Sequence, residues 1–232
     1  MRPRRGVLAN LMLIALTGCD VLSGAHSYRY RVTVEVETPV GLRTGSSIWE
    51  VETNAGSGIP DRSLHSRVHG EAVAVELPSG VLFATMRSQV LNSPGDYAAG
   101  LVNSHLRREP TPGAVMTRDW AENMRRIARA KPSFELAPDE LPLLVRFRDP
   151  KDANSLQSVS PKALNATFGN GVRLRRVIVA VTDERSKGNE ILDLLPWLAT
   201  HRGALERCPP ETLICEMPAK CSLTEGDFLR RA

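Results

Sequence analysis

The clearest pattern in the chain is a strict alternation of apolar and polar side chains over residues 28–37, YRYRVTVEVE. Tyrosine and valine occupy one set of alternate positions, and arginine, threonine and glutamate occupy the other. A period of two with aromatic and β-branched residues on one side is typical of a strand that buries one face. We therefore predict a strand whose valines face a core and whose charged side chains face water.

Further strands follow at short intervals. The tetrapeptide TPVG after the first strand predicts a turn, and residues 46–53 predict a returning strand with Trp49 and Val51 facing inward. Residues 68–77 and 81–86 read as a second pair, joined by LPSG, in which proline and glycine take positions that a type I turn prefers. Connections this short cannot join parallel neighbours, so the pattern predicts an antiparallel sheet.

The middle of the chain has a helical period instead. Residues 117–130 place tryptophan, methionine and isoleucine on one stripe, with Thr117 as the expected N-cap and Pro132 as the stop. Residues 96–108 are a second, weaker helical segment. A short helix is expected within residues 160–169, where Ser160 would be the N-cap, proline follows it and glycine ends the segment.

Two more strands are predicted in the second half, over residues 141–148 and 172–182, before an apolar helix or turn at 191–200 that Pro196 interrupts. In the first of these strands we expect Leu143, Val145 and Phe147 to face inward, and Leu144, Arg146 and Arg148 to face outward.

These elements predict an α+β fold: an antiparallel β-sheet, sandwich- or barrel-like, with a few packed helices. We expect one globular domain over residues 28–200, followed by a tail at 201–232 that contains cysteine and proline. The residues expected to be buried are Val32, Val34, Val36, Val145, Phe147, Val177 and Val179.

The first residues have a different character. Three arginines precede an apolar run of ten residues at 7–16 that only Asn10 interrupts, which is the pattern of a signal peptide over residues 1–18. Ten helical residues span only about 15 Å, half of a bilayer core, so a transmembrane anchor fits poorly. Two other interpretations of residues 1–18 are a generic signal peptide, with no lipid attached at its end, and an ordinary buried N-terminal helix.

The sequence LTGC that ends at Cys19 resembles the lipobox of bacterial lipoproteins. That resemblance implies that Cys19 is acylated and becomes the mature N-terminus, so the partner would be membrane lipid. It also implies a lipid anchor at the cell membrane on the periplasmic side, and Asp20 resembles the signal for retention at the inner membrane. Residues 19–27 would form a short tether whose extended length is about 30 Å, which keeps the domain close to the bilayer.

Composition and charge exclude other classes. With 42% hydrophobic and 24% charged residues, the 232-residue chain is neither a polytopic membrane protein nor a disordered acidic tail. The formal net charge is +4, but removing residues 1–18 takes away three arginines and no acidic residue, leaving 27 basic and 26 acidic residues. This near-neutral balance argues against a nucleic-acid partner.

Beyond the N-terminus, the segments YRYRVTVEVETPVGLRTGSS, FRDPKDANS, FGNGVRLRRV and LPWL are similar to an uncharacterised group of proteobacterial and prophage-associated proteins. The resemblance makes the fold plausible and implies no activity.

Three cysteines remain in the tail: Cys208, Cys215 and Cys221. An oxidising periplasm favours one disulfide with one leftover thiol, and the sequence leaves all three pairings open. A zinc site of three thiolates is the alternative, and it lacks the usual C-x2-C spacing. Free thiols are the third possibility.

The remaining candidates for chemistry are weak. Asp61, His65 and His69 lie four residues apart and could bind zinc on one helix face, but the segment reads as extended, with an arginine between the histidines. The chain has no H-E-x-x-H, G-x-S-x-G, P-loop or dinucleotide motif, and the sequence implies no cofactor.

The sequence therefore predicts a membrane-anchored, periplasm-facing lipoprotein that acts as a binding or structural module of the envelope. The alternative is an envelope hydrolase whose catalytic residues, carboxylates or a histidine, come together from distant positions. A cytoplasmic protein with a misread N-terminus is the third hypothesis.

Overall fold

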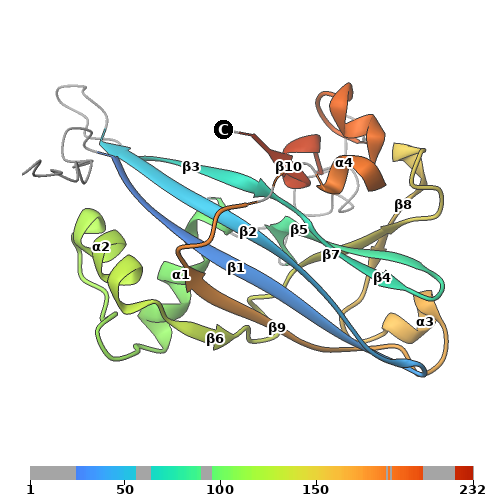
Figure 1. The fold of residues 1–232 in the computed structure, drawn as a ribbon, viewed down its shortest axis with the longest axis horizontal. Helices are drawn as coiled ribbons and strands as arrows, with labels where there is room; N and C mark the ends of the chain where they lie inside the picture. Colours follow the sequence, from blue (N-terminus) through green and yellow to red (C-terminus); the bar gives the residue numbers. More distant parts are fainter. Residues whose placement is uncertain are drawn as a thin grey trace, which may run out of the picture.

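The computed structural model describes residues 25–55, 64–89, 96–186, 188, 190–205 and 223–231, which form two antiparallel sheets with helices packed against them (Figure 1). The large sheet has the strand order β10-β3-β2-β1-β9-β6 and the small sheet the order β4-β5-β7-β8. This confirms the predicted α+β fold with antiparallel strands. The strands of the large sheet are β1 (Ala25–Thr38), β2 (Gly41–Ala55), β3 (Leu64–Glu71), β6 (Ser133–Glu135), β9 (Arg173–Thr182) and β10 (Leu229–Arg230).

The centre of the large sheet follows the alternation in the sequence. β1 pairs with β2 across a turn that closes between Thr38 and Gly41, and with β9 on its other side. The apolar positions of β1 turn toward the core, as predicted, because the other face carries arginine and glutamate. All seven residues expected to be buried are at most 5% exposed: Val32, Val34, Val36, Val145, Phe147, Val177 and Val179.

The predicted single strand at 68–77 is wrong, because the chain changes sheets within it. β3 ends at Glu71 in the large sheet, and β4 (Val73–Leu77) begins the small sheet after one residue, Ala72. Ala72 is buried, and its N–H donates to the carbonyl of Phe228 (2.8 Å). A strand that passes from one sheet to the other makes the corner of a two-layer fold.

The small sheet is completed by β5 (Gly80–Ser88), β7 (Pro142–Phe147) and β8 (Leu156–Val159). The predicted facing of β7 is wrong at Leu144. Leu143, Val145 and Phe147 are buried in one apolar cluster, but Leu144, expected to face outward, is fully buried in another. Because the small sheet has a core on each side, consecutive residues in the middle of β7 are apolar, as Leu143, Leu144 and Val145 are.

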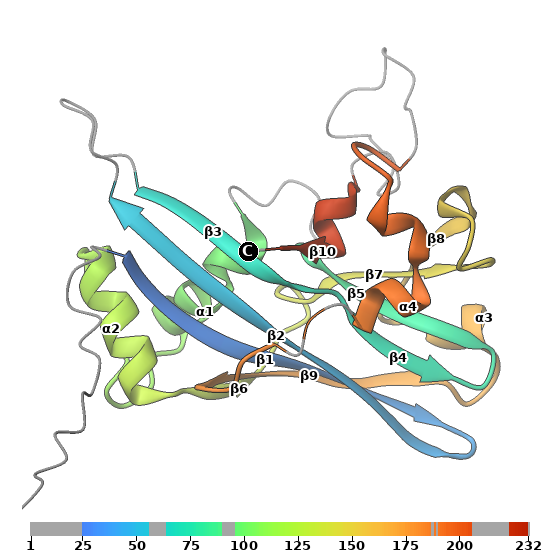
Figure 2. The same ribbon diagram turned by 45° about the horizontal axis from the view of Figure 1, so that its top comes forward.

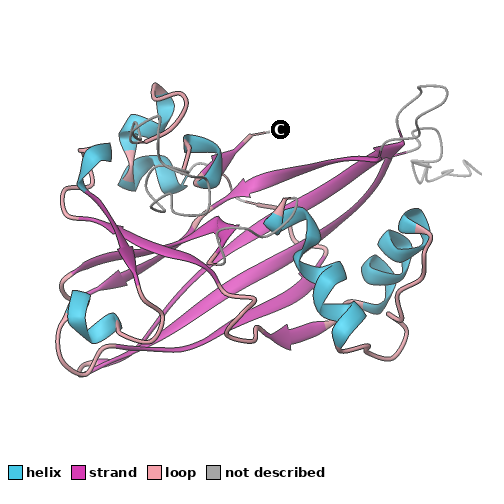
Figure 3. Ribbon diagram, turned by 180° about the vertical axis from the view of Figure 1, so that it is seen from behind, coloured by secondary structure: helices cyan, strands magenta, loops and turns pink. Residues whose placement is uncertain are grey.

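Helices α1 (Tyr97–Arg108) and α2 (Trp120–Ala130) cover the inner face of the large sheet, as Figure 3 shows from behind. Asp96 caps α1 by accepting from the N–H groups of Ala98 and Ala99. Asp119, and not Thr117, caps α2 by accepting from Glu122 N–H at 3.1 Å. The Thr117 hydroxyl donates instead to the Asn123 side chain, so the N-cap lies two residues after the predicted one.

The predicted helix at 160–169 is shorter than expected. The helix α3 (Leu164–Phe168) begins after a turn, and its N-cap is Ala163 without a side-chain cap. The segment before it is held by a turn bond from Ala163 N–H to the Ser160 carbonyl (3.0 Å), so Ser160 does not cap α3. Gly169 ends α3 with a positive φ of 99°, as the sequence predicted.

A second apolar cluster lies on the other side of the small sheet. It is covered by α4 (Glu190–Leu194), the 3-10 turns η2 (Pro196–Ala199) and η4 (Glu225–Asp227), and residues near the C-terminus. Leu205, Leu223 and Phe228 are all at most 4% exposed in this cluster. The described part of the C-terminal segment therefore contributes to the core, and β10 pairs with the end of β3.

The molecule has two distinct ends. β1 starts beside α2 at one end and runs to the hairpin tip near α3 at the other (Figures 1 and 2). Pro39 at the tip approaches Gly171, where an added Cβ would lie 2.9 Å from the proline ring. In the part of the chain described above, no helix is long and apolar enough to cross a membrane.

Candidate functional site

The site residues predicted from the sequence lie outside the described residues. Cys19, Cys208, Cys215 and Cys221 are all in segments whose structure is not described. Acylation of Cys19 and a disulfide in the tail therefore stay predictions. The described residues do form hollows and buried polar clusters elsewhere.

The segment after β9 crosses the outer face of the large sheet on its way to α4 (Figures 1 and 2). Its first residues are tied down by ion pairs, Asp183 with Lys131 and Glu184 with Arg31. We call residues 183–186 the strap. Arg185 and Ser186 lie over β1 and β2, and the outer face of the sheet is hollowed on both sides of them.

The larger hollow, of about 620 Å³, lies beside β3, and we call it the β3 hollow. Strands from both ends of the chain build it, together with the strap. Its lining residues are Arg29, Ile48, Glu50, Glu52, His69, Gly70, Glu71, Arg185, Ser186, Gly188, Leu229, Arg230 and Arg231. Four arginines and three glutamates thus converge on one concave surface.

Most charges in the β3 hollow are already paired. Arg29 binds Glu50 on the neighbouring strand, and Arg230 binds Asp96. Within the described residues, the guanidinium groups of Arg185 and Arg231 have no hydrogen-bond or ion-pair partner, and both side chains are exposed. They are the groups in this hollow that can bind a negatively charged ligand without breaking an existing contact.

His69 is held at the edge of the same hollow. Its Nδ1 lies 3.0 Å from the carbonyl oxygen of Arg231, and its Nε2 lies 3.5 Å from a carboxylate oxygen of Glu52. β3 is extended here, as expected from the sequence, and pairing places His69 directly opposite Glu50. Both ring nitrogens therefore face oxygen atoms of the protein, which hold the imidazole in place.

The second hollow, of about 560 Å³, lies on the other side of the strap beside β4, and we call it the β4 hollow. Its charged residues are mostly acidic: Glu71, Glu76, Glu190 and Asp193, against Arg43. The two hollows therefore differ in charge although they share Glu71. An anionic ligand fits the β3 hollow, and the β4 hollow would repel it.

Glu71 stands where the two hollows meet. Its side chain accepts a hydrogen bond from Ile191 N–H (2.9 Å) at the start of α4, and only 7% of the residue is exposed. Burial raises the pKa of the Glu71 carboxyl, partly offset by hydrogen bonds from the backbone of α4. Glu71 therefore fixes α4 beside the strap, and its bonded carboxylate is not a free ligand group.

A second polar cluster is buried under α1. His105 Nδ1 lies 3.0 Å from each carboxylate oxygen of Glu140, and the imidazole stacks on Phe134 with ring centroids 3.7 Å apart. Arg108 also pairs with Glu140, whose carboxylate in addition accepts from Ala137 N–H (2.9 Å). A hollow of about 190 Å³ opens beside Arg108 and Glu140, but His105 does not line it. This cluster braces α1 against the segment before β7.

The sequence did not reveal the β3 hollow because its residues come from β1, β2, β3, the strap and the C-terminus. No local spacing connects Arg29 with Arg185 and Arg231. The histidine spacing in the sequence gives no indication of the neighbours of His69, because Glu52 and the Arg231 carbonyl are far from it in sequence. Comparison with protein-family models, with curated proteins and with solved structures finds no match for this chain.

Proposed function

We propose that this protein is a lipoprotein that faces the periplasm, anchored in the cell membrane through acylated Cys19, and that it acts as a binding module of the envelope. Support for the anchor is the order of three features in the sequence: the arginines, the short apolar run and the LTGC segment that ends at Cys19. Asp20 favours the inner membrane.

The β3 hollow is the binding site in this proposal. The observation that carries it is the pair of exposed arginines, Arg185 and Arg231, which line a hollow of about 620 Å³ and have no partner among the described residues. Guanidinium groups bind carboxylate and phosphate through paired hydrogen bonds, so the expected ligand carries at least one such anionic group. The acidic β4 hollow next to it would orient a ligand that also carries a positive charge.

The anchor is tested by labelling cells with radioactive palmitate. The native protein should take up label and partition into detergent, and Cys19→Ala should lose both properties. Ser23→Ala, four residues further on, is a matched control that should keep them. Equal labelling and partitioning of the native protein and Cys19→Ala would refute the lipoprotein assignment.

The compartment is tested by counting thiols on the exported, unreduced protein. Two of Cys208, Cys215 and Cys221 should be joined, leaving one reactive thiol, because the periplasm is oxidising. A zinc site would instead release three thiols only after chelation. Three reactive thiols without a chelator would indicate a reducing compartment and would contradict export.

The β3 hollow is tested with a photo-crosslinking amino acid at position 186, inside the hollow, and at position 162, far from it. Crosslinks specific to position 186 should disappear in Arg185→Glu/Arg231→Glu. They should persist in Arg148→Glu/Lys151→Glu, which makes the same change of charge at exposed residues outside the hollow. Identical crosslinks from both positions, or loss in both variants, would contradict a ligand site in the hollow.

An envelope hydrolase is the second candidate, and one observation favours it: His69 and the carboxylates of Glu50 and Glu52 meet in the β3 hollow. The engagement of both His69 nitrogens argues against it. If the purified protein cleaves chromogenic esters or glycosides, and His69→Gln and Glu52→Gln each abolish cleavage, the hydrolase replaces the binding module.

A further inference from the structure

The helix α2 carries a group of exposed arginines at one end of the molecule. In residues 117–131 there are five basic side chains and two acidic ones, within a chain that has a nearly even balance once residues 1–18 are removed. Asn123, Met124 and Ile127 face the core, so the charged residues occupy the opposite side of the helix. The positive charge of this protein is therefore concentrated locally.

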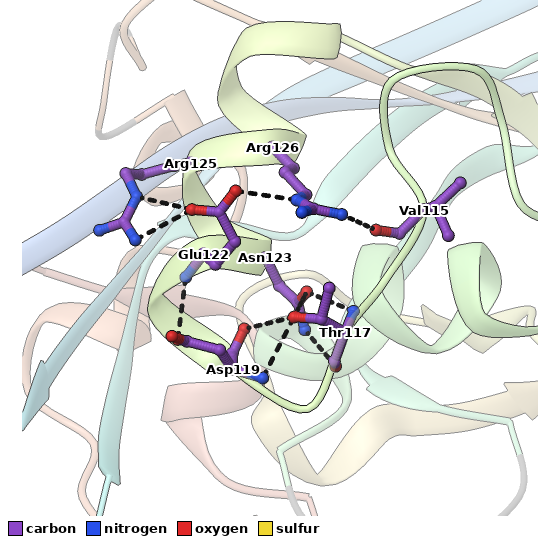
Figure 4. Close-up of polar contacts among 7 residues, drawn as sticks. All are labelled: Val115, Thr117, Asp119, Glu122, Asn123, Arg125 and Arg126. Carbon is purple, nitrogen blue, oxygen red and sulfur yellow. Dashed lines mark hydrogen bonds and ion pairs between the residues drawn. The ribbon is translucent and has the colours of Figure 1, made fainter.

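Contacts at the start of α2 leave part of this charge free (Figure 4). Glu122 accepts from Arg125 (3.0 Å) and from Arg126 (2.9 Å), so one carboxylate is shared by two guanidinium groups. In the described part of the chain, Arg118 and Arg129 have no side-chain partner, and both are exposed. We call Arg118, just before the N-cap, together with Arg125 and Arg129 on the helix, the α2 arginine face.

An exposed apolar side chain lies beside Arg126, the neighbour of Arg125 on the helix (Figure 4). Val115 is 54% exposed, and its carbonyl oxygen accepts from Arg126 (2.9 Å), which fixes the loop against the helix (Figure 4). At a membrane surface the Arg126 cation would meet the headgroups while Val115 enters the interface, which adds to the attraction of the neighbouring arginines.

The place of α2 in the fold gives this surface its partner. α2 packs on β1 and lies at the end of the molecule where β1 begins (Figures 1 and 2). From Cys19 to Ala25, the first described residue, an extended chain reaches only about 20 Å. If Cys19 carries the lipid, the start of β1 stays within about 20 Å of the membrane, so α2 beside it can touch the headgroups.

We infer that the α2 arginine face docks on anionic phospholipid headgroups and so sets the orientation of the domain on the membrane. This inference deepens the proposed function and rests on it, because the anchor is what brings α2 to the bilayer. With α2 at the membrane, the hairpin tip between β1 and β2 points away from it, and the β3 hollow on the side of the sheet stays open.

The experiment uses a chain that begins at residue 20. Every member of both apolar clusters lies between Tyr28 and Leu229, so this chain keeps the whole described core. Its binding to vesicles of phosphatidylethanolamine and phosphatidylglycerol is compared with binding to phosphatidylcholine vesicles by co-sedimentation. We expect preference for the anionic vesicles and loss of that preference in high salt.

The decisive variant is Arg118→Gln/Arg125→Gln/Arg129→Gln. Each arginine near an anionic surface contributes about fivefold in partitioning, so the triple variant should weaken binding roughly 100-fold. The matched control is Arg148→Gln/Lys151→Gln/Lys162→Gln, which removes three exposed positive charges outside α2 and should change binding less than about threefold. Thermal unfolding of each variant checks that the fold is intact.

Two outcomes overturn the inference: equal binding to both kinds of vesicle, or equal losses in the two triple variants, which would mean that only net charge matters. The palmitate experiment on the full chain is independent of these results. If Cys19 is labelled and vesicle binding fails, only the inference falls. If vesicle binding depends on α2 and Cys19 is not labelled, the anchor in the proposed function falls.

Discussion

The large sheet exposes one of its faces, whereas the small sheet is covered on both. On the outer face of the large sheet, charged residues of neighbouring strands pair with one another, as Arg176 does with Glu35 (2.9 Å) and Arg173 with Glu37. In the small sheet, Leu144 of β7 is buried against the large sheet, and Leu143 and Val145 are buried under α4 and the C-terminal segment.

This difference decides where the protein tolerates substitution. In a strand with one solvent-exposed face, substitution of every second residue should change the unfolding free energy little, because those side chains remain in contact with water. A strand buried on both faces has no such positions. Residues at the contact between the two sheets should tolerate substitution least, because an atom added there can be accommodated only if a whole sheet shifts.

The largest effect is expected at Gly45, where β2 crosses β4. A Cβ at this position would lie 2.0 Å from the carbonyl oxygen and 2.8 Å from the carbonyl carbon of Ala74, and backbone atoms cannot move aside as a flexible side chain can. Gly45→Ala should therefore push the sheets apart and cost more than about 3 kcal/mol of unfolding free energy, or prevent folding. Gly100→Ala in α1 is the control, since its nearest neighbour would be 3.8 Å away. Urea unfolding measures both, and equal stabilities would refute the close approach.

The next effect concerns adjacent residues of β7. Leu143→Ala and Leu144→Ala should each cost about 2 to 5 kcal/mol, because the two side chains fill different cores. If Leu144→Ala costs less than about 1 kcal/mol in chemical denaturation, the small sheet has an exposed face after all.

The corresponding pair in β1 should behave unequally. Val34 is fully buried and Thr33 points to the outer face, so Val34→Ala should cost about 1 to 3 kcal/mol and Thr33→Ala less than about 1 kcal/mol. Thermal or urea unfolding of the two variants gives the contrast directly. Similar costs at the two positions would contradict the one-sided burial of the large sheet.

The same contrast explains which parts of the fold could be predicted. The facing of β1 and β9 is visible in the sequence because water selects polar residues on one side of these strands. The facing of Leu144 is not visible in the sequence because Leu143, Leu144 and Val145 are all apolar and fill two different cores, while Arg146 on the side of Leu144 suggests an outward face. β6, β8 and β10 have three, four and two residues, too few to show a period.

The break between β3 and β4 at Ala72 is visible in the sequence pattern. Within the predicted strand 68–77, the inward residue of β3 is Val68, at an even number, whereas those of β4 are Val73, Val75 and Leu77, at odd numbers. Such a change of parity is incompatible with one regular strand. The β3 hollow leaves no signal in the sequence. It forms where the strap and the C-terminal residues pack on the sheet, and residues that come together only in the folded chain share no regular spacing.

The smallest expected effect is a difference in pH dependence between the stability contributed by Glu35 and that contributed by Glu71. Hydrogen bonding to Arg176 lowers the pKa of Glu35 on the wet face, whereas burial raises the pKa of Glu71 at the junction between the sheets. The stability that Glu35 contributes is therefore present above its ordinary value of 4.5 and is lost as the pH falls through the folded pKa. For Glu71 the contribution is present below 4.5 and is lost as the pH rises through its folded pKa.

Glu35→Gln and Glu71→Gln should accordingly change the pH profile of unfolding in opposite directions. Between about pH 3 and pH 7, the stability of the native protein relative to Glu35→Gln should rise, and relative to Glu71→Gln it should fall, each by at most about 1 kcal/mol. Urea titrations across this range measure both differences. Profiles that run parallel would mean that Glu71 is as well solvated as Glu35, and the covered junction between the sheets would then have to be open to water.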